Sequence, residues 1–195
     1  MYLNGHWAVR HFFWMRPRLI TSMIERLLPE RSNCLDFGGG SGVFHPTLSR
    51  LFRSVTCVDL DQTEATEIGK RYDLLNVELV QGDVSTLELG SRRFQAIVAA
   101  DVLEHFKDLC VPARAIHGWL SDDGLLFTSL PTENWVYRLL RIVFKKKKPL
   151  DHYHSAAEVE AYLCANGFCK VAAVFVPLYI PLFPLFAVSA WKKHS

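Results

Sequence analysis

Short apolar runs of strand length alternate with amphipathic stretches along most of this 195-residue chain. Five of these runs are predicted to be buried strands: residues 34–37, 54–59, 76–80, 94–99 and 125–130. Near-continuous apolar strands that alternate with helical or turn-rich segments are typical of a parallel sheet covered on both faces. The pattern therefore predicts an α/β protein, a three-layer α/β/α domain with a mostly parallel sheet and an antiparallel last strand.

Two helices have clear sequence signals. One is predicted to begin at Pro17, because proline suits the first helical position, which leaves residues 1–15 as an amino-terminal arm. Apolar residues recur after it at i, i+4 and i+8: Leu19, Ile20, Met23, Ile24, Leu27 and Leu28. The other begins at Ser155, which forms an S-x-x-E capping box with Glu158, and ends near Gly167.

The carboxy-terminal run 171–190 contains no charged residue. It is about long enough to cross a bilayer, which takes roughly 20 residues, but its prolines would interrupt such a helix. We therefore predict two strands, 171–176 and 186–191, joined by an apolar loop. The alternative is a membrane-contacting tail anchor.

Composition narrows the class of protein. The length fits one domain over residues 1–195, and half of the residues are hydrophobic, which excludes a disordered chain. A formal net charge of +2 argues against a broad nucleic-acid surface, so we expect no nucleic-acid partner. Five cysteines without a C-x-x-C pair indicate free thiols in a reducing, cytoplasmic setting and no zinc site.

The stretch CLDFGGGSG, residues 34–42, joins the first predicted strand to a helix. Glycine lets a ligand approach where a Cβ would collide, so a turn of this kind indicates a nucleotide-type cofactor cradle. The dinucleotide fingerprint G-x-G-x-x-G does not fit, because Val43 or His45 stands where the third glycine belongs. This disfavours a nicotinamide oxidoreductase. The stretch instead has an acid-x-Gly-x-Gly-x-Gly pattern, formed by Asp36, Gly38, Gly40 and Gly42.

This pattern closely resembles motif I of the class I S-adenosylmethionine (SAM) methyltransferases. A second segment, AADVLEHFKD at residues 99–108, resembles motif IV of the ubiquinone-type, methyltransferase type 11–12-like branch that acts on small molecules. The resemblance covers roughly residues 16–131. It implies a Rossmann-like sheet, SAM as the cofactor and S-adenosylhomocysteine (SAH) as its product. The N-P-P-Y and double-glutamate signatures of nucleic-acid and protein-arginine methylases are absent from the sequence.

The same resemblance assigns cofactor contacts beyond the glycines. Asp59, at the end of the second strand, would accept hydrogen bonds from the ribose hydroxyls, with Asp61 as the alternative. Asp83 would contact the adenine amino group and Val84 the ring, and the alternative for Asp83 is a turn or helix cap.

Three further positions complete the expected cofactor site. Leu60 follows Asp59, and Ala100 follows the fourth strand. The amino-terminal RHFFWMRPRLI resembles openings of uncharacterised bacterial methyltransferases, which implies that Arg16 or Arg18 reaches the methionine carboxylate. A solvent-facing basic helix start is the alternative.

Methyl transfer needs a base only when the acceptor must lose a proton. His105 is the first candidate, because it lies just beyond the carboxyl end of the fourth strand, where ligands bind in open sheets. A histidine that only packs there is the alternative. His152, Tyr153 and His154 are the second candidates, and we assign His105 and His154 as catalytic.

A divalent metal at this site is a less favoured hypothesis than a site without one. Ubiquinone and small-RNA 2′-O-methyltransferases hold a divalent metal with acid-x-x-Glu-His, and the small-RNA enzymes add a later histidine. Asp101, Glu104, His105 and His154 resemble that set, but aspartate has a shorter reach than the glutamate of those families. We therefore assign no metal ligand.

Two segments suggest the acceptor. Residues 134–150 would form a basic amphipathic helix that can lie on an anionic membrane surface, and the apolar residues 178–183 would add to this peripheral membrane contact. The alternative treats 134–154 as an insertion that serves as a lid. The predicted function is SAM-dependent methyl transfer, by in-line displacement, to a small-molecule or lipid- or saccharide-linked acceptor. The alternative is a non-catalytic SAM-binding partner subunit.

Overall fold

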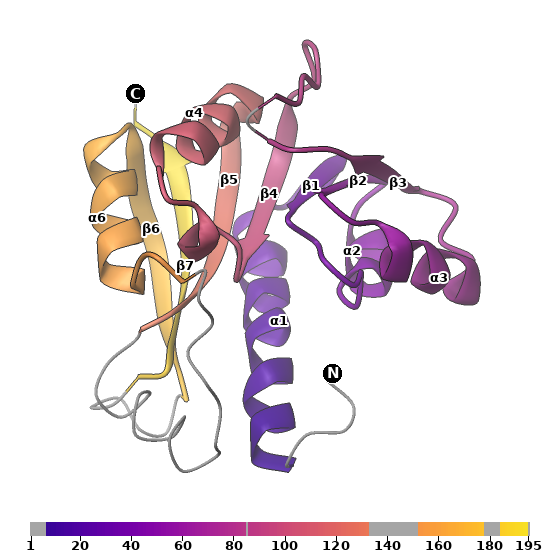
Figure 1. The fold of residues 1–195 in the computed structure, drawn as a ribbon, viewed down its shortest axis with the longest axis horizontal. Coiled ribbons are helices and arrows are strands. Elements are labelled where there is room, and N and C mark those ends of the chain that lie inside the picture. The colour runs from indigo at the N-terminus through magenta and orange to yellow at the C-terminus, as the bar shows by residue number, and fades with distance from the viewer. Residues whose placement is uncertain (1–6, 85, 133–151, 178–183, 195) are drawn as a thin grey trace.

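The computed structural model describes residues 7–84, 86–132, 152–177 and 184–194. Seven strands form one sheet in the order β3-β2-β1-β4-β5-β7-β6 (Figure 1). The strands are β1 (Asn33–Phe37), β2 (Ser54–Asp59), β3 (Val77–Gln81), β4 (Phe94–Ala100), β5 (Leu120–Pro131), β6 (Phe168–Val176) and β7 (Phe186–Lys193). Strands β1 to β5 pair in parallel, and β7 is antiparallel to both β5 and β6. The mostly parallel sheet with an antiparallel last strand is confirmed.

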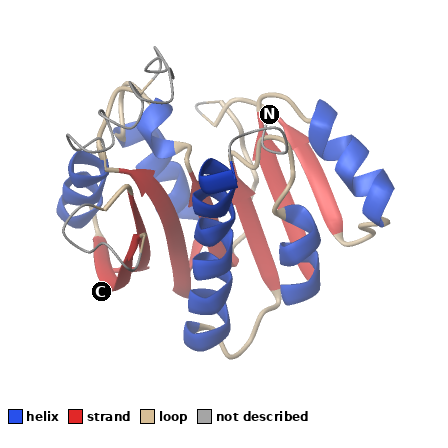
Figure 2. Cartoon of the chain, turned by 90° about the horizontal axis from the view of Figure 1, so that it is seen from below, coloured by secondary structure: helices blue, strands red, loops and turns tan. Residues whose placement is uncertain are grey.

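Helices cover both faces of this sheet. They are α1 (Trp7–Leu27), α2 (His45–Leu51), α3 (Thr63–Tyr72), the 3-10 turn η1 (Leu103–His105), α4 (Cys110–Trp119) and α6 (Ala156–Ala165). Buried residues of α1 and α2 pack on one face, and those of α4 and α6 pack on the other. Figure 2 shows α1 lying along its face of the sheet. These are the three layers that the sequence predicts.

The central strands contribute to both cores because successive side chains point to opposite faces. In β5, Leu126 packs on the α4 side and Phe127 on the α1 side, and both are fully buried. In β4, Ile97 and Val98 divide in the same way. A strand buried on both faces must be apolar throughout, which explains why these strands read as continuous apolar runs.

The first helix begins earlier than predicted. It starts at Trp7, so Pro17 lies inside it and residues 7–15 are not an arm. A proline inside a helix removes one backbone hydrogen bond. The apolar stripe after Pro17 nevertheless buries Ile20 and Ile24 against the sheet. This tertiary packing outweighs the local preference and sets the direction of Arg16.

The carboxy-terminal run forms β6 and β7, as predicted, and a helical tail anchor over this run is not what the structure shows. Among the described helices, none combines the length and apolarity needed to cross a membrane. The apolar loop 178–183 and most of the insertion 134–154 lie outside the described residues. The Ser155–Glu158 capping box is present at the start of α6.

Candidate functional site

The glycine loop between β1 and α2 forms one wall of the site. Gly38 has a φ of 72°, and a Cβ built there would lie 2.3 Å from Val102 Cγ2, in the segment after β4. A side chain at Gly38 would therefore strain the backbone and displace Val102. Gly40 has a φ of 53° and nothing within 4 Å of its Cβ position, so its peptide unit faces open space.

A cavity of about 170 Å³ opens beside this loop. Five residues that the sequence assigns to the cofactor share its walls: Arg16, Asp36, Gly38, Gly40 and Ala100. Asp101 and Ser129 also line it, from the ends of β4 and β5. Ligands of open parallel sheets bind at the carboxyl ends of strands where the strand order reverses, and β1 and β4 flank that point here.

Arg16 reaches this cavity from α1, whereas Arg18 is exposed and does not line it. The buried Arg16 guanidinium forms an ion pair with Asp101 and lies 4.1 Å from the centroid of the Phe186 ring. The Ser129 hydroxyl donates a 3.3 Å hydrogen bond to the other oxygen of Asp101. The structure thus distinguishes between the two arginines and adds Asp101 as a second charged group at the cavity.

Asp59 is tied to the glycine loop. Its Oδ2 accepts a 2.8 Å hydrogen bond from the Gly40 N–H, and its Oδ1 accepts one of 3.1 Å from the Asp61 N–H. Asp61 is exposed and accepts hydrogen bonds from the Thr63 N–H and hydroxyl at the start of α3, which lower the pKa of Asp61. The Asp61 carboxylate, which is the alternative to Asp59, is therefore occupied by hydrogen bonds at the start of α3. Leu60, between the two, is 67% exposed.

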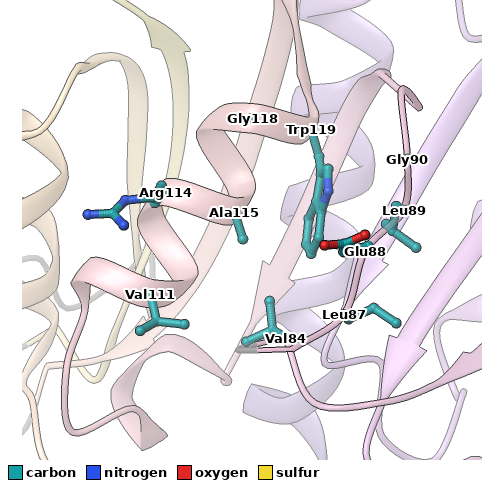
Figure 3. A pocket seen from close by; sticks show the side chains of 10 residues that line it. All are labelled: Val84, Leu87, Glu88, Leu89, Gly90, Val111, Arg114, Ala115, Gly118 and Trp119. Carbon is teal, nitrogen blue, oxygen red and sulfur yellow. The ribbon is translucent and has the colours of Figure 1, made fainter.

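Asp83 and Val84 follow β3, but the glycine-loop cavity does not include them. Asp83 is exposed, and its carbonyl oxygen accepts hydrogen bonds from two following backbone N–H groups. Val84 is buried and lines a separate groove of about 430 Å³ between α4 and residues 87–90 (Figure 3). Trp119 closes this groove, which is larger than the cavity yet contains no glycine-loop residue.

A second polar cluster follows β4. Potential metal-ligating atoms of Glu104, His105 and His152 lie within 4.8 Å of one another, and Glu104 is buried. The two imidazole rings meet edge to face with centroids 4.7 Å apart. The Tyr153 N–H donates a 2.9 Å hydrogen bond to the Glu104 carbonyl oxygen, which holds this segment against η1.

The partner of His105 is His152 and not His154. His154 Nε2 lies 3.3 Å from the carbonyl oxygen of Lys107, so this side chain meets the backbone beyond η1. Asp101 is engaged by Arg16, so the four-residue metal set considered from the sequence does not assemble as written. Spacing alone does not reveal which residue of the DHYHS stretch turns inward, because the backbone contact of Tyr153 decides it.

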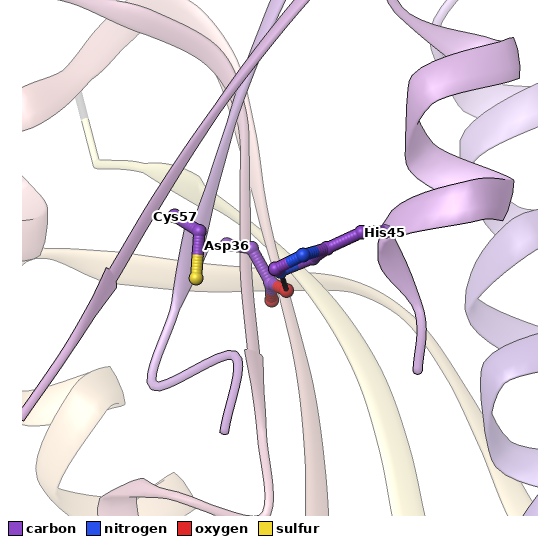
Figure 4. A group of neighbouring side chains, drawn as sticks. All are labelled: Asp36, His45 and Cys57. Carbon is purple, nitrogen blue, oxygen red and sulfur yellow. Dashed lines mark ion pairs between the residues drawn. The ribbon is translucent and has the colours of Figure 1, made fainter. Parts of the chain in front are cut away.

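A buried side-chain pair that sequence reasoning missed lies under the glycine loop. His45 Nε2, in the first residue of α2, is 3.1 Å from Asp36 Oδ2, and both side chains are buried (Figure 4). Cys57, beside Asp36 in β2, completes the cluster. Burial and the charge of Asp36 raise the pKa of the Cys57 thiol well above its usual range. The sequence draws attention to His45 only because it stands where the dinucleotide fingerprint would need its third glycine.

The cavity fits SAM by the chemistry of its walls. The glycine loop leaves room where a Cβ would intrude, and the Arg16 guanidinium suits the carboxylate of the methionine end. Asp36 and Asp101 provide negative charge for its ammonium and sulfonium groups. Asp59 lies at the loop with a carboxylate that suits the ribose diol.

Comparison with known proteins agrees with this reading. A family model described as a methyltransferase domain matches residues 12–171. A probable S-adenosylmethionine-dependent methyltransferase of Mycobacterium tuberculosis (strain H37Rv) is 27% identical over 168 residues, covering 82% of this chain and 57% of that protein. The ubiquinone biosynthesis O-methyltransferase of Bradyrhizobium diazoefficiens is 30% identical over 110 residues, 56% of this chain and 44% of that protein. The chain thus spans only about half the length of these relatives.

Solved structures share the fold. A S-adenosylmethionine-dependent methyltransferase from Clostridium acetobutylicum matches with a TM-score of 0.75 at 15% identity, covering 94% of this chain and 92% of that one. The N-methyltransferase NodS from Bradyrhizobium japonicum matches with a TM-score of 0.73 at 17% identity, covering 95% and 98%. The family match over most of the sequence, with this fold and glycine cradle, shows that the chain belongs to the class I SAM-dependent methyltransferases.

Proposed function

We propose that this protein catalyses SAM-dependent methyl transfer, by in-line displacement, to an oxygen or nitrogen of a small-molecule or lipid- or saccharide-linked acceptor. One observation carries the proposal. The segment after β4 packs Val102 against Gly38 of the cofactor loop, and within three residues it supplies Glu104 and His105. A cofactor cradle and an acid–base cluster therefore share one short turn.

Bound SAM supplies a methyl group that its sulfonium already activates. The protein's own contribution is then mainly to hold the reactants in line, which can supply on the order of 7–11 kcal/mol of the barrier. The glycine loop and Arg16 hold the cofactor end. The turn after β4 holds the acceptor end, because it leads directly from the cavity residue Asp101 to His105.

His105 is the proposed general base. It meets the His152 ring edge to face, and the carboxylate of the buried Glu104 lies in the same cluster, an arrangement that orients an imidazole and stabilises it once it takes a proton. Such a base is useful for an acceptor hydroxyl or N–H. This supports a heteroatom acceptor over a carbon acceptor.

The acceptor class rests on the sequence and on one relative. Residues 134–150 and 178–183, which lie outside the described part of the chain, are basic–amphipathic and apolar respectively. A relative of 30% identity over 110 residues is named for ubiquinone biosynthesis. Both favour an apolar or lipid-borne acceptor and peripheral contact with an anionic membrane.

Labelled methyl transfer into fractionated cell extract tests this function. We expect label in the lipid or apolar fraction, lost when His105 is replaced by glutamine, together with binding to vesicles that contain anionic lipid. SAM binding without transfer to any fraction would instead favour a non-catalytic SAM-binding subunit. Equal labelling of water-soluble acceptors without vesicle binding would contradict the lipid-borne acceptor.

The histidine cluster also has a donor set that suits a divalent cation, with two imidazoles and one carboxylate. A base mechanism needs no cation, so exhaustive chelation should leave turnover unchanged. Turnover that is lost on chelation and restored by Mg²⁺ or Mn²⁺ would assign Glu104, His105 and His152 to a metal.

A further inference from the structure

We propose that His45 is a positioning residue which holds the Asp36 carboxylate under the glycine loop, so that this carboxylate forms a negatively charged floor that favours SAM over SAH. SAM carries a positive sulfur, whereas the sulfur of SAH is neutral. The inference rests on the proposed function, because it concerns the cofactor of the same site. It extends that function to the selection of fresh cofactor over spent product.

The pair lies directly beneath the loop. A Cβ built on Gly39 would be 2.5 Å from Asp36 Oδ2, and one built on Gly42 would be 2.8 Å from His45 Nδ1. The two side chains meet at 3.1 Å between His45 Nε2 and Asp36 Oδ2 (Figure 4). Both ends of the loop therefore rest on this one contact.

Each member of the pair depends on the other. Apart from their mutual contact, Asp36 Oδ2 and both ring nitrogens of His45 have no hydrogen-bond partner among the described residues. His45 is 0% exposed and Asp36 is 3% exposed. Removing one partner of a buried polar pair leaves the other buried without a polar contact, which is costly. His45 thus holds the Asp36 carboxylate in place beneath the loop.

In the buried cluster of Asp36, His45 and Cys57, Asp36 is the one carboxylate. Cys57 faces the pair from β2, and burial raises the pKa of its thiol, so it stays neutral. Gln62 is a neutral amide that donates hydrogen bonds to the Cys57 and Val80 carbonyl oxygens. Asp59 holds the loop through the Gly40 N–H. A zinc ion at this place would need the Cys57 thiolate, which this environment disfavours.

The floor acts on the cofactor because Asp36 lines the cavity. A carboxylate in a partly enclosed site attracts a positive sulfur, and the attraction ends when the methyl group leaves. The methionine end carries the same charges in both molecules, so the floor distinguishes them chiefly at sulfur. We therefore expect the ratio of the two dissociation constants, and not only their size, to depend on His45.

Calorimetric titration of the full chain with SAM and with SAH tests this. Asp36→Asn removes the charge, and His45→Leu removes the imidazole whose Nε2 lies 3.1 Å from Asp36 Oδ2, at similar volume. Each should weaken SAM binding about tenfold and SAH binding only about two- to threefold. His45→Gln, whose amide N–H can replace that of the imidazole, should restore the ratio. His117→Gln is the matched control, since His117 lies on α4 against Phe168.

The outcomes separate this inference from the proposed function. If His45→Leu does not fold in a thermal-unfolding scan, Asp36→Asn alone still decides the charge effect. Equal losses of SAM and SAH affinity in Asp36→Asn would show that the pair only supports the loop, and stoichiometric zinc in the purified protein would show a metal site instead. Either result overturns the inference. A wild-type protein that binds neither ligand would refute the proposed function itself.

Discussion

The cofactor half and the acceptor half of this site are built in different ways. The cofactor half is nearly continuous in sequence: Asp36, the glycine loop and His45 lie on β1, its turn and α2. The proposed acceptor half joins His105, in η1 after β4, to His152, near the end of the 134–154 insertion. A local motif fixes the first, whereas the second depends on where a distant segment docks. In the proposed function, residues that are neighbours in the sequence hold the cofactor, and residues that are distant in the sequence hold the acceptor.

The largest effect is expected when the proposed base is removed and cofactor binding is left intact. His105→Gln should lower kcat by about 10²–10⁴-fold, the usual contribution of a general base, and leave the dissociation constant of SAM unchanged. Turnover assays with calorimetry on the same preparation measure both. A parallel loss of SAM binding would mean that the two halves are not separable.

The converse change is made in the cofactor loop. Gly38→Ala forces a side chain into a backbone with φ of 72° and into Val102, so we expect a loss of roughly 1–3 kcal/mol in stability and SAM binding weakened at least tenfold. Thermal unfolding and calorimetry measure the two effects. Gly69→Ala is the control, because Gly69 lies in α3 with nothing within 4 Å of its Cβ position, and it should bind SAM normally.

A smaller effect is expected at the methionine end of the cavity. Arg16→Gln removes the cation that pairs with Asp101, so SAM binding should weaken about tenfold, as loss of a charge-assisted hydrogen bond implies. Arg18→Gln, two residues along the same helix and exposed, should bind SAM as the wild type does. Equal affinities for the two variants would move the methionine carboxylate away from Arg16.

The smallest effect distinguishes Asp59, the last residue of β2, from Asp61, two residues beyond it. Hydrogen bonds from Thr63 lower the pKa of Asp61, so its contribution to stability is present above the unfolded-state pKa and is lost as pH falls through the lower folded-state pKa. Asp61→Asn should slightly lower the melting temperature at pH 7 and not at strongly acidic pH, with SAM binding unchanged. Asp59→Asn should weaken SAM binding at pH 7, and the reverse pattern would exchange their roles.

Most of the fold could be predicted because its strands are buried on both faces and read as apolar runs. The start of α1 could not, since Pro17 is a local signal for a helix start and only packing of Ile20 and Ile24 on the sheet overrides it. A one-dimensional pattern contains no information about that packing.

The sequence pattern is limited in the same way when it is used to predict the site. Motif spacing places Asp36, Gly38 and Gly40 on one cavity because they are neighbours in the chain. It cannot choose His152 over His154, since a backbone contact with Glu104 sets which side chain faces His105. It also cannot reveal the Asp36–His45 pair, which forms only when the turn brings the start of α2 back against β1.

A crystal structure of the protein grown with SAH tests the central claim most directly. We predict ligand density in the cavity of Arg16, Gly38, Gly40 and Ala100, with its ribose at Asp59. Density in the groove between Val84 and Trp119, or a glycine-loop cavity that stays empty at saturating ligand, would contradict it.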